Sequence, residues 1–387
     1  MAEQVEFVVV GLGALGSATA YQLARRGAQV VGLERFALGH EHGASHDTSR
    51  ILRHSYHTPG YVRLTFDAYA DWAALSTDAG EELPTVVGGL DLFPPDAAIP
   101  AVDYVESMRA CGVDFEMLAP TDVAQRWPQF RLPDGTTALY QSRAAIVPAA
   151  RGTAAMQRLA ASYGAVLRDQ SPVTSVRDRD AAGVEVVTEA TTYRCRRLVV
   201  CADAWTNQVL AGLGWQLPLT VTLEQVSYFA PPEPAQFVPG RMPLWIWMDD
   251  PSFYGFPCYG EPTVKAAQDC GGAVVDPDDR SFEPDPDRLA LLAGFMTRTL
   301  PSAGPVVRSK TCLYTLPPDR DFVLGPVPGC EAVLVGLGAA HGFKFAPTFG
   351  RLLAELASTG ETAADVAPFA LDRRALTEPV PTLSWLV

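Results

Sequence analysis

Residues 5–16, VEFVVVGLGALG, decide the fold of this chain of 387 residues. Five of the first six are apolar and four of these are valine, as in a buried parallel strand. Three glycines follow, and then residues 17–26 form an alanine-rich stretch that favours a helix and ends before Gly27, a typical C-terminal glycine. A second strand-like run, residues 28–33, stops at Glu34. This order predicts a βαβ unit that binds a dinucleotide.

Each glycine of the turn has its own expected task. Gly11 permits the tight turn, Gly13 lets the backbone approach a pyrophosphate, and Gly16 lets the helix pack closely on the strand. The N-terminus of the helix would face the phosphates. Glu34 follows Gly11 by 23 residues, and its carboxylate would accept hydrogen bonds from a ribose. The alternative, a glycine-rich turn that arose by chance, does not explain the acid and the two strands.

Bulk composition excludes several classes of function. The chain is 48% hydrophobic and 19% charged, with a net charge of −14 and no run of basic residues. We therefore expect a soluble protein that binds neither nucleic acid nor an anionic membrane. The N-terminus does not read as a signal peptide, and no apolar run approaches the roughly 18 residues of a membrane span. Seven cysteines without a CxxC pair indicate reduced thiols, a cytoplasmic location and no metal site.

Strand and helix patterns alternate to the end of the chain. Residues 88–93 (GGLDLF) and 197–202 (RLVVCA) are typical of strands, and residues 332–357 repeat the order of strand, glycine-rich turn and helix. This predicts an α/β fold in which a Rossmann-like domain carries an inserted α+β domain with an antiparallel sheet. The predicted nucleotide domain comprises residues 1–85, 146–215 and 305–387, and the predicted substrate domain comprises residues 86–145 and 216–304.

Lysine is scarce in this chain, since only Lys265, Lys310 and Lys344 are found among the 30 basic residues. In the extended segment RSKTCLYT, Lys310 shares a face with Cys312 and Tyr314. A lysine beside a cysteine raises its thiolate fraction and therefore its reactivity. The alternative is an inert cysteine in a buried strand.

Several segments together resemble the monomeric sarcosine oxidase family of flavoenzymes. They are GLGALG with its later acid, SHDTSRILRH, FYGFPCYGEPTVK, KTCLYT with PDRDF, and HGFKF, and they extend over essentially the whole chain. The resemblance implies a fold like that of glutathione reductase and D-amino-acid oxidase. It also implies a monomer that binds FAD through a covalent thioether to Cys312. The cofactor-binding residues would be Gly11, Gly13, Gly16, Glu34, Arg35, Ser45, His46, Val173 and Cys312.

The resemblance also implies roles for residues of the reaction site. Lys265 would lie over the flavin ring and stabilise the negative charge that develops on O2, and Arg50 would lie against the flavin. Arg53 and Lys344 would clamp the substrate carboxylate, and Tyr254 and Tyr314 would line the cavity. From the residues alone, the lysines could equally be solvated and the tyrosines part of the core. If residues 46–54 were helical, His46, Arg50, Arg53 and His54 would share one face, which could be a solvated basic face.

Two positions depart from the family pattern. Asp269 stands where sarcosine oxidases carry a histidine four residues after the flavin-facing lysine, and Asp203 stands where the family has a glycine before Ala-Trp. A carboxylate at 269 could accept a ring N–H or a proton from an amine. This pattern is more similar to the branch that includes the piperideine-2-carboxylate oxidase of nikkomycin biosynthesis, which makes picolinate. We assign no role to Asp203.

The sequence therefore predicts a flavin-dependent oxidase that removes a hydride from a secondary or cyclic imino acid and reduces O2 to H2O2. The preferred substrates are piperideine-2-carboxylate and L-pipecolate, with picolinate as an end product and antibiotic biosynthesis as the setting. Sarcosine or another N-methyl amino acid is the alternative within this class. A nicotinamide-dependent dehydrogenase would share the βαβ opening, and a non-catalytic flavin-binding scaffold would not need Lys265 and Lys344.

Overall fold

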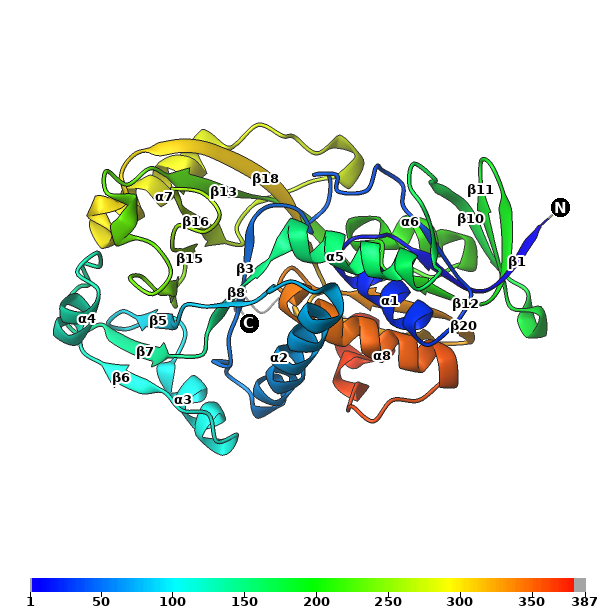
Figure 1. Ribbon diagram of the computed structural model, residues 1–387, viewed down its shortest axis with the longest axis horizontal. Coiled ribbons are helices and arrows are strands. Elements are labelled where there is room, and N and C mark those ends of the chain that lie inside the picture. The colour runs from blue at the N-terminus through cyan, green and yellow to red at the C-terminus, as the bar shows by residue number, and fades with distance from the viewer. Residues whose placement is uncertain (1, 379–387) are drawn as a thin grey trace.

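The computed structural model describes residues 2–378, in which two large sheets lie side by side (Figure 1). The first sheet has eight strands and contains the glycine-rich turn. Its parallel strands are β1 (Glu3–Val10), β2 (Val30–Leu33), β9 (Val166–Arg168), β12 (Thr192–Val200) and β20 (Cys330–Leu337). Its antiparallel strands are β10 (Val173–Asp178), β11 (Val184–Thr188) and β19 (Val323–Val327).

Small residues hold the helices of this domain together. Helix α1 (Ala14–Arg25) packs against both α5 (Ala149–Ser162) and α8 (Ala346–Thr359). A Cβ atom added to Gly350 would lie only 2.4 Å from Cβ of Ala18, so α8 and α1 approach at the limit that glycine allows. The C-terminal part of the chain thereby packs on the N-terminal βαβ unit, which produces one nucleotide-binding domain from distant segments.

The second sheet has nine strands, in which β5 and β14 run parallel and the other neighbours run antiparallel. Its strands are β5 (Gly89–Phe93), β6 (Glu116–Leu118), β7 (Thr137–Gln141), β13 (Thr220–Phe229), β14 (Leu244–Trp247), β15 (Ser252–Phe256), β16 (Val264–Asp269), β17 (Ala273–Val274) and β18 (Val306–Leu316). Helix α7 (Pro286–Thr299) is capped by Asp285, whose carboxylate accepts hydrogen bonds from the backbone N–H of Asp287 and Arg288. The remaining helices are α2 (Pro59–Ala79), α3 (Ala101–Ala110), α4 (Pro120–Arg126), α6 (Thr206–Leu210) and α9 (Arg374–Thr377).

A three-stranded sheet lies where the two parts of the molecule meet. It consists of β3 (Ser49–Leu52), β8 (Ala145–Pro148) and β4 (Thr85–Val86), with β8 in the centre. The helical arrangement considered for residues 46–54 is therefore wrong. Arg50 is paired with Val147 of β8, and this antiparallel ladder outweighs the helical spacing of the basic residues.

The predicted architecture is confirmed, with a Rossmann-like sheet beside a mostly antiparallel one. By hydrogen bonding, however, β18 belongs to the nine-stranded sheet, because it pairs with β13 along its length, whereas the domain limit predicted at residue 305 lies before it. In Figure 1, β18 runs from the outer end of that sheet to the middle of the molecule. The domain limits stay a prediction. Among residues 2–378, no helix is both long and apolar enough to cross a membrane.

Candidate functional site

Strand register brings five of the expected site residues onto one face of the nine-stranded sheet. Lys265 on β16 lies opposite Phe256 and Tyr228, and Tyr254 on β15 lies opposite Ala267. Residues directly opposite each other in an antiparallel pair project from the same face, as do alternate residues of one strand. The same rule adds Asp269 of β16 and, through β13 and β18, Cys312 and Tyr314. This face is therefore the floor of the candidate site.

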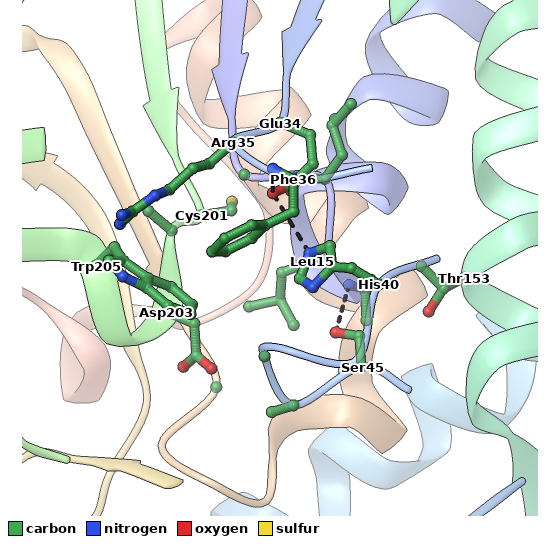
Figure 2. Close-up of a pocket in the computed structure, with 18 of the residues that line it drawn as sticks. Leu15, Glu34, Arg35, Phe36, His40, Ser45, Thr153, Cys201, Asp203 and Trp205 are labelled. Carbon is green, nitrogen blue, oxygen red and sulfur yellow. Dashed lines mark hydrogen bonds and ion pairs between the residues drawn. The ribbon is translucent and has the colours of Figure 1, made fainter. Parts of the chain in front are cut away.

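A cavity of about 410 Å³ extends from Cys312 and Tyr314 of this floor to the glycine-rich turn. Figure 2 shows part of its lining around Glu34 and Ser45. Most of the residues expected to bind the cofactor line it: Gly11, Gly13, Glu34, Arg35, Ser45, His46, Val173 and Cys312, together with Arg50 and Tyr314. Gly16 is not part of the lining. Its role is packing, because a Cβ atom there would lie 1.8 Å from the carbonyl oxygen of Gly11.

The glycine-rich turn fits a dinucleotide. Gly11 has φ +88°, which favours glycine, and a Cβ atom on Gly13 would lie 2.9 Å from the Ser45 hydroxyl oxygen, which accepts a hydrogen bond from the Ala14 backbone N–H. Backbone hydrogen bonds also orient Glu34, since Leu12 N–H donates to it over 2.8 Å. Burial opposes its charge, yet hydrogen bonds from His40 and from backbone N–H groups hold the pKa of Glu34 below its ordinary value.

His46 supplies a second indication of a bound polar group. Both ring nitrogens are buried and have no hydrogen-bond partner within residues 2–378. Burial, assisted by the charge of Arg50, lowers the pKa of His46 to about 4, so the ring is neutral. Buried polar atoms are almost always hydrogen-bonded, and the cavity beside this ring is where the flavin nucleotide would supply a partner.

Arg35 and Arg50 are fixed by contacts within the protein. The Arg35 guanidinium lies 2.7 Å from the carboxylate of Asp278 and over the rings of Phe36 and Trp205 (Figure 2). Arg50 donates to three backbone carbonyl oxygens, those of Ser49, Ala44 and His46, at 2.8, 2.8 and 3.0 Å. It therefore braces the loop that enters β3 while its side chain lines the cavity.

The Lys265 ammonium is deeply buried, with 3% of its side chain exposed. Its Nζ lies 2.6 Å from Oδ2 of Asp47 and donates to the Ser49 carbonyl oxygen over 3.1 Å. Burial lowers the pKa of Lys265 to about 8, although Asp47 opposes this shift. The alternative of a solvated surface lysine is thus wrong for this residue.

A second group of buried charges comprises Asp269, Lys344 and Arg53. The Tyr314 hydroxyl donates to Oδ1 of Asp269 over 3.2 Å, and burial raises the pKa of that carboxyl. Lys344, in the short helix η7 (Gly342–Phe345), donates to the His341 carbonyl oxygen over 2.8 Å. Burial first, then Arg53, lower the pKa of Lys344 to about 7, whereas Asp269 raises it.

Arg53 forms an ion pair with Asp91, which is not among the site residues expected from the sequence. Its Nη1 lies 2.5 Å from Oδ1 of Asp91, and both side chains are almost completely buried. Its Nε has no hydrogen-bond partner among the residues that the structure describes. A guanidinium offers two forked edges. Nη1 is used by Asp91, and the edge that contains Nε has no hydrogen-bond partner within residues 2–378.

The environment of Cys312 corrects the expected role of Lys310. Lys310 Nζ lies 2.6 Å from the carboxylate of Glu41, in a partly exposed ion pair. Burial raises the pKa of the Cys312 thiol to about 11, and the cations that oppose this shift are Arg50, Lys265 and Arg280. The physical reason is that Lys265 is buried and Arg50 half-buried near the thiol, where charges interact strongly, whereas the charge of Lys310 is paired with Glu41 near solvent.

Three functional candidates were missed in the sequence. Asp47 lies within the quoted segment SHDTSRILRH, and Asp91 is the only charged residue of the run GGLDLF. An acid inside an otherwise apolar strand is a usable signal, because a buried charge needs a partner. Arg280 left no such signal, since it lies in a Pro/Asp-rich loop. Its Nη2 donates to the Thr311 carbonyl oxygen over 3.0 Å and its Nη1 to that of His42 over 2.7 Å.

Asp203 also lines the cavity (Figure 2). It has φ +46°, which is uncommon for a residue other than glycine, and the family pattern has glycine there. Burial raises the pKa of its carboxyl to about 6. Nothing else in its contacts gives it a role.

A dinucleotide site at the carboxyl ends of parallel strands, beside a floor of buried cations on a mostly antiparallel sheet, is the arrangement of a flavin-dependent oxidoreductase. The family model described as "DAO: FAD dependent oxidoreductase" matches residues 6–356. The chain belongs to this FAD-dependent oxidoreductase family, and the predicted enzyme class and cofactor are confirmed at that level.

Individual relatives are similar over their full length. The chain is 34% identical to a monomeric sarcosine oxidase of Streptomyces avermitilis over 95% of this chain and 97% of the relative, and 30% identical to the human peroxisomal sarcosine oxidase over 95% of each. Among solved structures it resembles NikD, an unusual amino acid oxidase essential for nikkomycin biosynthesis. That match has a TM-score of 0.86 and 31% identity, and covers 95% of this chain and 98% of that chain. The predicted resemblance is thus confirmed.

Proposed function

We propose that this protein is an FAD-dependent oxidase of secondary or cyclic imino acids, with piperideine-2-carboxylate or L-pipecolate as substrate, O2 as electron acceptor and H2O2 as product. The observation that carries the proposal is the buried group of Asp269, Tyr314, Lys344 and Arg53 beside the flavin cavity. Two cations to bind a carboxylate and one carboxyl to bind an N–H match the two ends of an imino acid. Similarity to NikD, an amino acid oxidase essential for nikkomycin biosynthesis, supports this choice. We propose picolinate as the product of an onward reaction.

The residues of the site divide the work. Bound FAD supplies hydride acceptance and electron transfer to O2. Arg53 and Lys344 hold the substrate carboxylate, Tyr314 lines the cavity with Tyr254 beside it, and Asp269 accepts the ring N–H or its proton. Lys265 places a positive charge where negative charge develops during reduction of O2, with Arg50 as a second cation.

Oxidation of sarcosine or another N-methyl amino acid is the second candidate, favoured by the similarity to sarcosine oxidases. Membership of the FAD-dependent family argues against the nicotinamide-dependent dehydrogenase. We also propose that the protein is a monomer and is located in the cytoplasm.

Anaerobic reduction of the bound flavin tests the substrate class. The holoenzyme is mixed without O2 with piperideine-2-carboxylate, L-pipecolate, L-proline, sarcosine and N-methyl-L-tryptophan, and loss of the flavin absorbance is followed. We expect the six-membered cyclic acids to bleach the flavin fastest. Faster bleaching by sarcosine would transfer the assignment to N-methyl amino acids, and no bleaching by any of these compounds would contradict the oxidase.

Replacing Cys312 by Ala is expected to abolish covalent attachment of FAD. The contacts at Gly11, Gly13 and Glu34 are untouched, so the variant should still bind FAD reversibly. The measurement is flavin fluorescence on a denaturing gel together with the intact mass. Cys258→Ala, which alters another buried thiol, is the matched control and should keep the flavin. A fluorescent band that still migrates with the Cys312→Ala protein would exclude this anchor.

Replacing Arg53 or Lys344 by Ala is expected to weaken binding of a carboxylate inhibitor about ten- to a hundredfold, since a charge-assisted hydrogen bond contributes about 1.5–3 kcal/mol. An uncharged amine analogue should bind almost as before. Wild-type affinity should decline as the pH rises above about 7, because the free Lys344 ammonium then loses its proton. Titration of flavin absorbance measures both effects, and a variant with unchanged carboxylate affinity would remove that residue from the clamp.

A further inference from the structure

Asp47 has a backbone conformation that residues other than glycine seldom adopt, with φ +81°. It lies between His46, which lines the cofactor cavity, and Ser49, the first residue of β3. Its side chain is only 3% exposed. Such conformations persist where surrounding contacts impose them, and they are concentrated at functional sites. The conformation of Asp47 therefore indicates that the contacts of its carboxylate have a function.

Each carboxylate oxygen of Asp47 has a close partner, through an ion pair at Oδ2 and a hydrogen bond at Oδ1. Oδ2 lies 2.6 Å from Nζ of Lys265, and Oδ1 accepts a hydrogen bond from the Tyr228 hydroxyl. Tyr228 lies directly opposite Lys265 in the pairing of β13 with β16, so the sheet register fixes the phenol beside the amine. The carboxylate is thus held on both sides by the nine-stranded sheet.

The Lys265 nitrogen lies close to three oxygens, two of which accept a hydrogen bond from it while the third forms an ion pair. They are Oδ2 of Asp47, the Ser49 carbonyl oxygen at 3.1 Å and the Ser49 hydroxyl oxygen at 3.4 Å. A neutral amine could make the two hydrogen bonds to Ser49, but it would leave the charge of Asp47 buried without this counterion. The geometry therefore fits the charged form of Lys265.

Other titratable and charged groups nearby also affect the charges of Lys265 and Asp47. Arg50 and the Cys312 thiol also face Lys265, and His46 and Glu41 lie near Asp47. Burial and Arg50 lower the pKa of Lys265, and Asp47 raises it. Burial disfavours charge on Asp47 as well, but Lys265 and Arg50 hold its pKa well below the usual range.

We propose that Asp47 is a positioning residue that keeps Lys265 in its ammonium form, through a buried ion pair fixed by Tyr228 and by the left-handed turn at residue 47. This inference rests on the proposed function, in which the Lys265 charge assists the reduction of O2. It assigns to Asp47 the task of maintaining that charge at neutral pH, where a buried amine without a counterion would be neutral.

The scarcity of lysine allows a direct test. Holoenzyme grown with lysine labelled with ¹³C at Cε gives signals from Lys265, Lys310 and Lys344 alone, and Lys265→Met identifies the signal of Lys265. The shift of that signal is followed against pH. Asp47→Asn should lower the pKa of Lys265 by about 1–3 units, the usual effect of an adjacent opposite charge. An unchanged pKa overturns the proposal.

The matched control is Asp67→Asn, which makes the same chemical change on α2. Asp67 is half exposed and lies 3.5 Å from Arg351. Its replacement should leave the Lys265 titration where it is in the wild type. If Asp47→Asn does not fold, Tyr228→Phe takes its place: without the phenol, more of the carboxylate charge acts on Lys265, and its pKa should rise. An unchanged or lower pKa in Tyr228→Phe counts against the inference.

The oxidative half-reaction supplies a second readout. After reduction of the flavin, reoxidation by O2 in Asp47→Asn should be slower than in the wild type at pH 8, by roughly fivefold for a pKa one unit lower and roughly tenfold more for each further unit. The difference should shrink as the pH falls toward the lowered pKa. An equal slowing at every pH would indicate a general structural defect and overturn the proposal. If Lys265→Met reoxidises at the wild-type rate, the proposed role of Lys265 fails, yet the lysine signal still decides whether Asp47 sets its protonation.

Discussion

Replacing Lys265 by Met is expected to slow reoxidation of the reduced flavin by about 10²–10³-fold, the usual loss when one preorganised charge is removed from a reaction site. Methionine keeps the unbranched shape but cannot carry the charge. Flavin reduction by the substrate should change much less, because the proposed substrate contacts come from Arg53, Lys344 and Asp269. Stopped-flow mixing, first with substrate without O2 and then with O2, separates the two half-reactions.

A second variant distinguishes loss of the charge from structural damage in Lys265→Met. Removing Lys265 leaves Asp47 buried without its partner, since the two side chains are each only 3% exposed. Lys265→Arg restores a cation and should recover part of the reoxidation rate, although a planar guanidinium does not reproduce a compact ammonium. Equal losses in both half-reactions would mean that Lys265 supports the fold of the site rather than the reaction with O2.

Replacing Asp269 by Asn should depress turnover of piperideine-2-carboxylate or L-pipecolate by about 10²-fold or more, the lower range for losing a positioned acid or base. The shape is preserved, but the charge and the basicity are lost. Burial raises the pKa of Asp269, so wild-type flavin reduction should fall on the acidic side as this carboxylate takes up a proton. In Asp269→Asn that acidic limb should vanish.

Two further variants sharpen the assignment. Tyr314→Phe removes the hydroxyl that donates to Asp269 over 3.2 Å and retains the ring, so it should move the acidic limb to higher pH without abolishing it. Asp269→His restores the residue that the resemblance implies for sarcosine oxidases and should move preference toward sarcosine. If Asp269→Asn oxidised the cyclic imino acids as fast as the wild type, the substrate assignment would be wrong and only the oxidase class would remain supported.

The first 34 residues allowed the nucleotide-binding unit to be predicted, because its rules are local. Gly11 and Gly16 do in the structure what a βαβ turn requires. The segment around Arg50 shows the limit of such rules. Its basic residues recur at helical spacing, yet β3 pairs with β8, about 95 residues further along the chain, and that ladder cannot be seen in a local pattern.

The site could be predicted only in part for the same reason. Resemblance indicated Lys265, Arg53 and Lys344, but their charges depend on partners from other elements. Asp91 comes from the nine-stranded sheet, and Asp47 from the loop before β3. The predicted effect of Lys310 on the Cys312 thiol was wrong, because Lys310 is near Cys312 in sequence but forms its ion pair with Glu41. Electrostatic roles follow spatial neighbours, which sequence spacing does not supply.

The membership of β18 in the nine-stranded sheet has a consequence for refolding. A flavin bonded to Cys312 of β18 and bound by the turn after β1 would link the two sheets. The two linked positions lie about 300 residues apart in the chain. After denaturation, the holoenzyme would carry its own prosthetic group instead of recapturing it from dilute solution. Recovery of native enzyme after dilution from denaturant should then be independent of added FAD, whereas Cys312→Ala should recover in proportion to the FAD supplied.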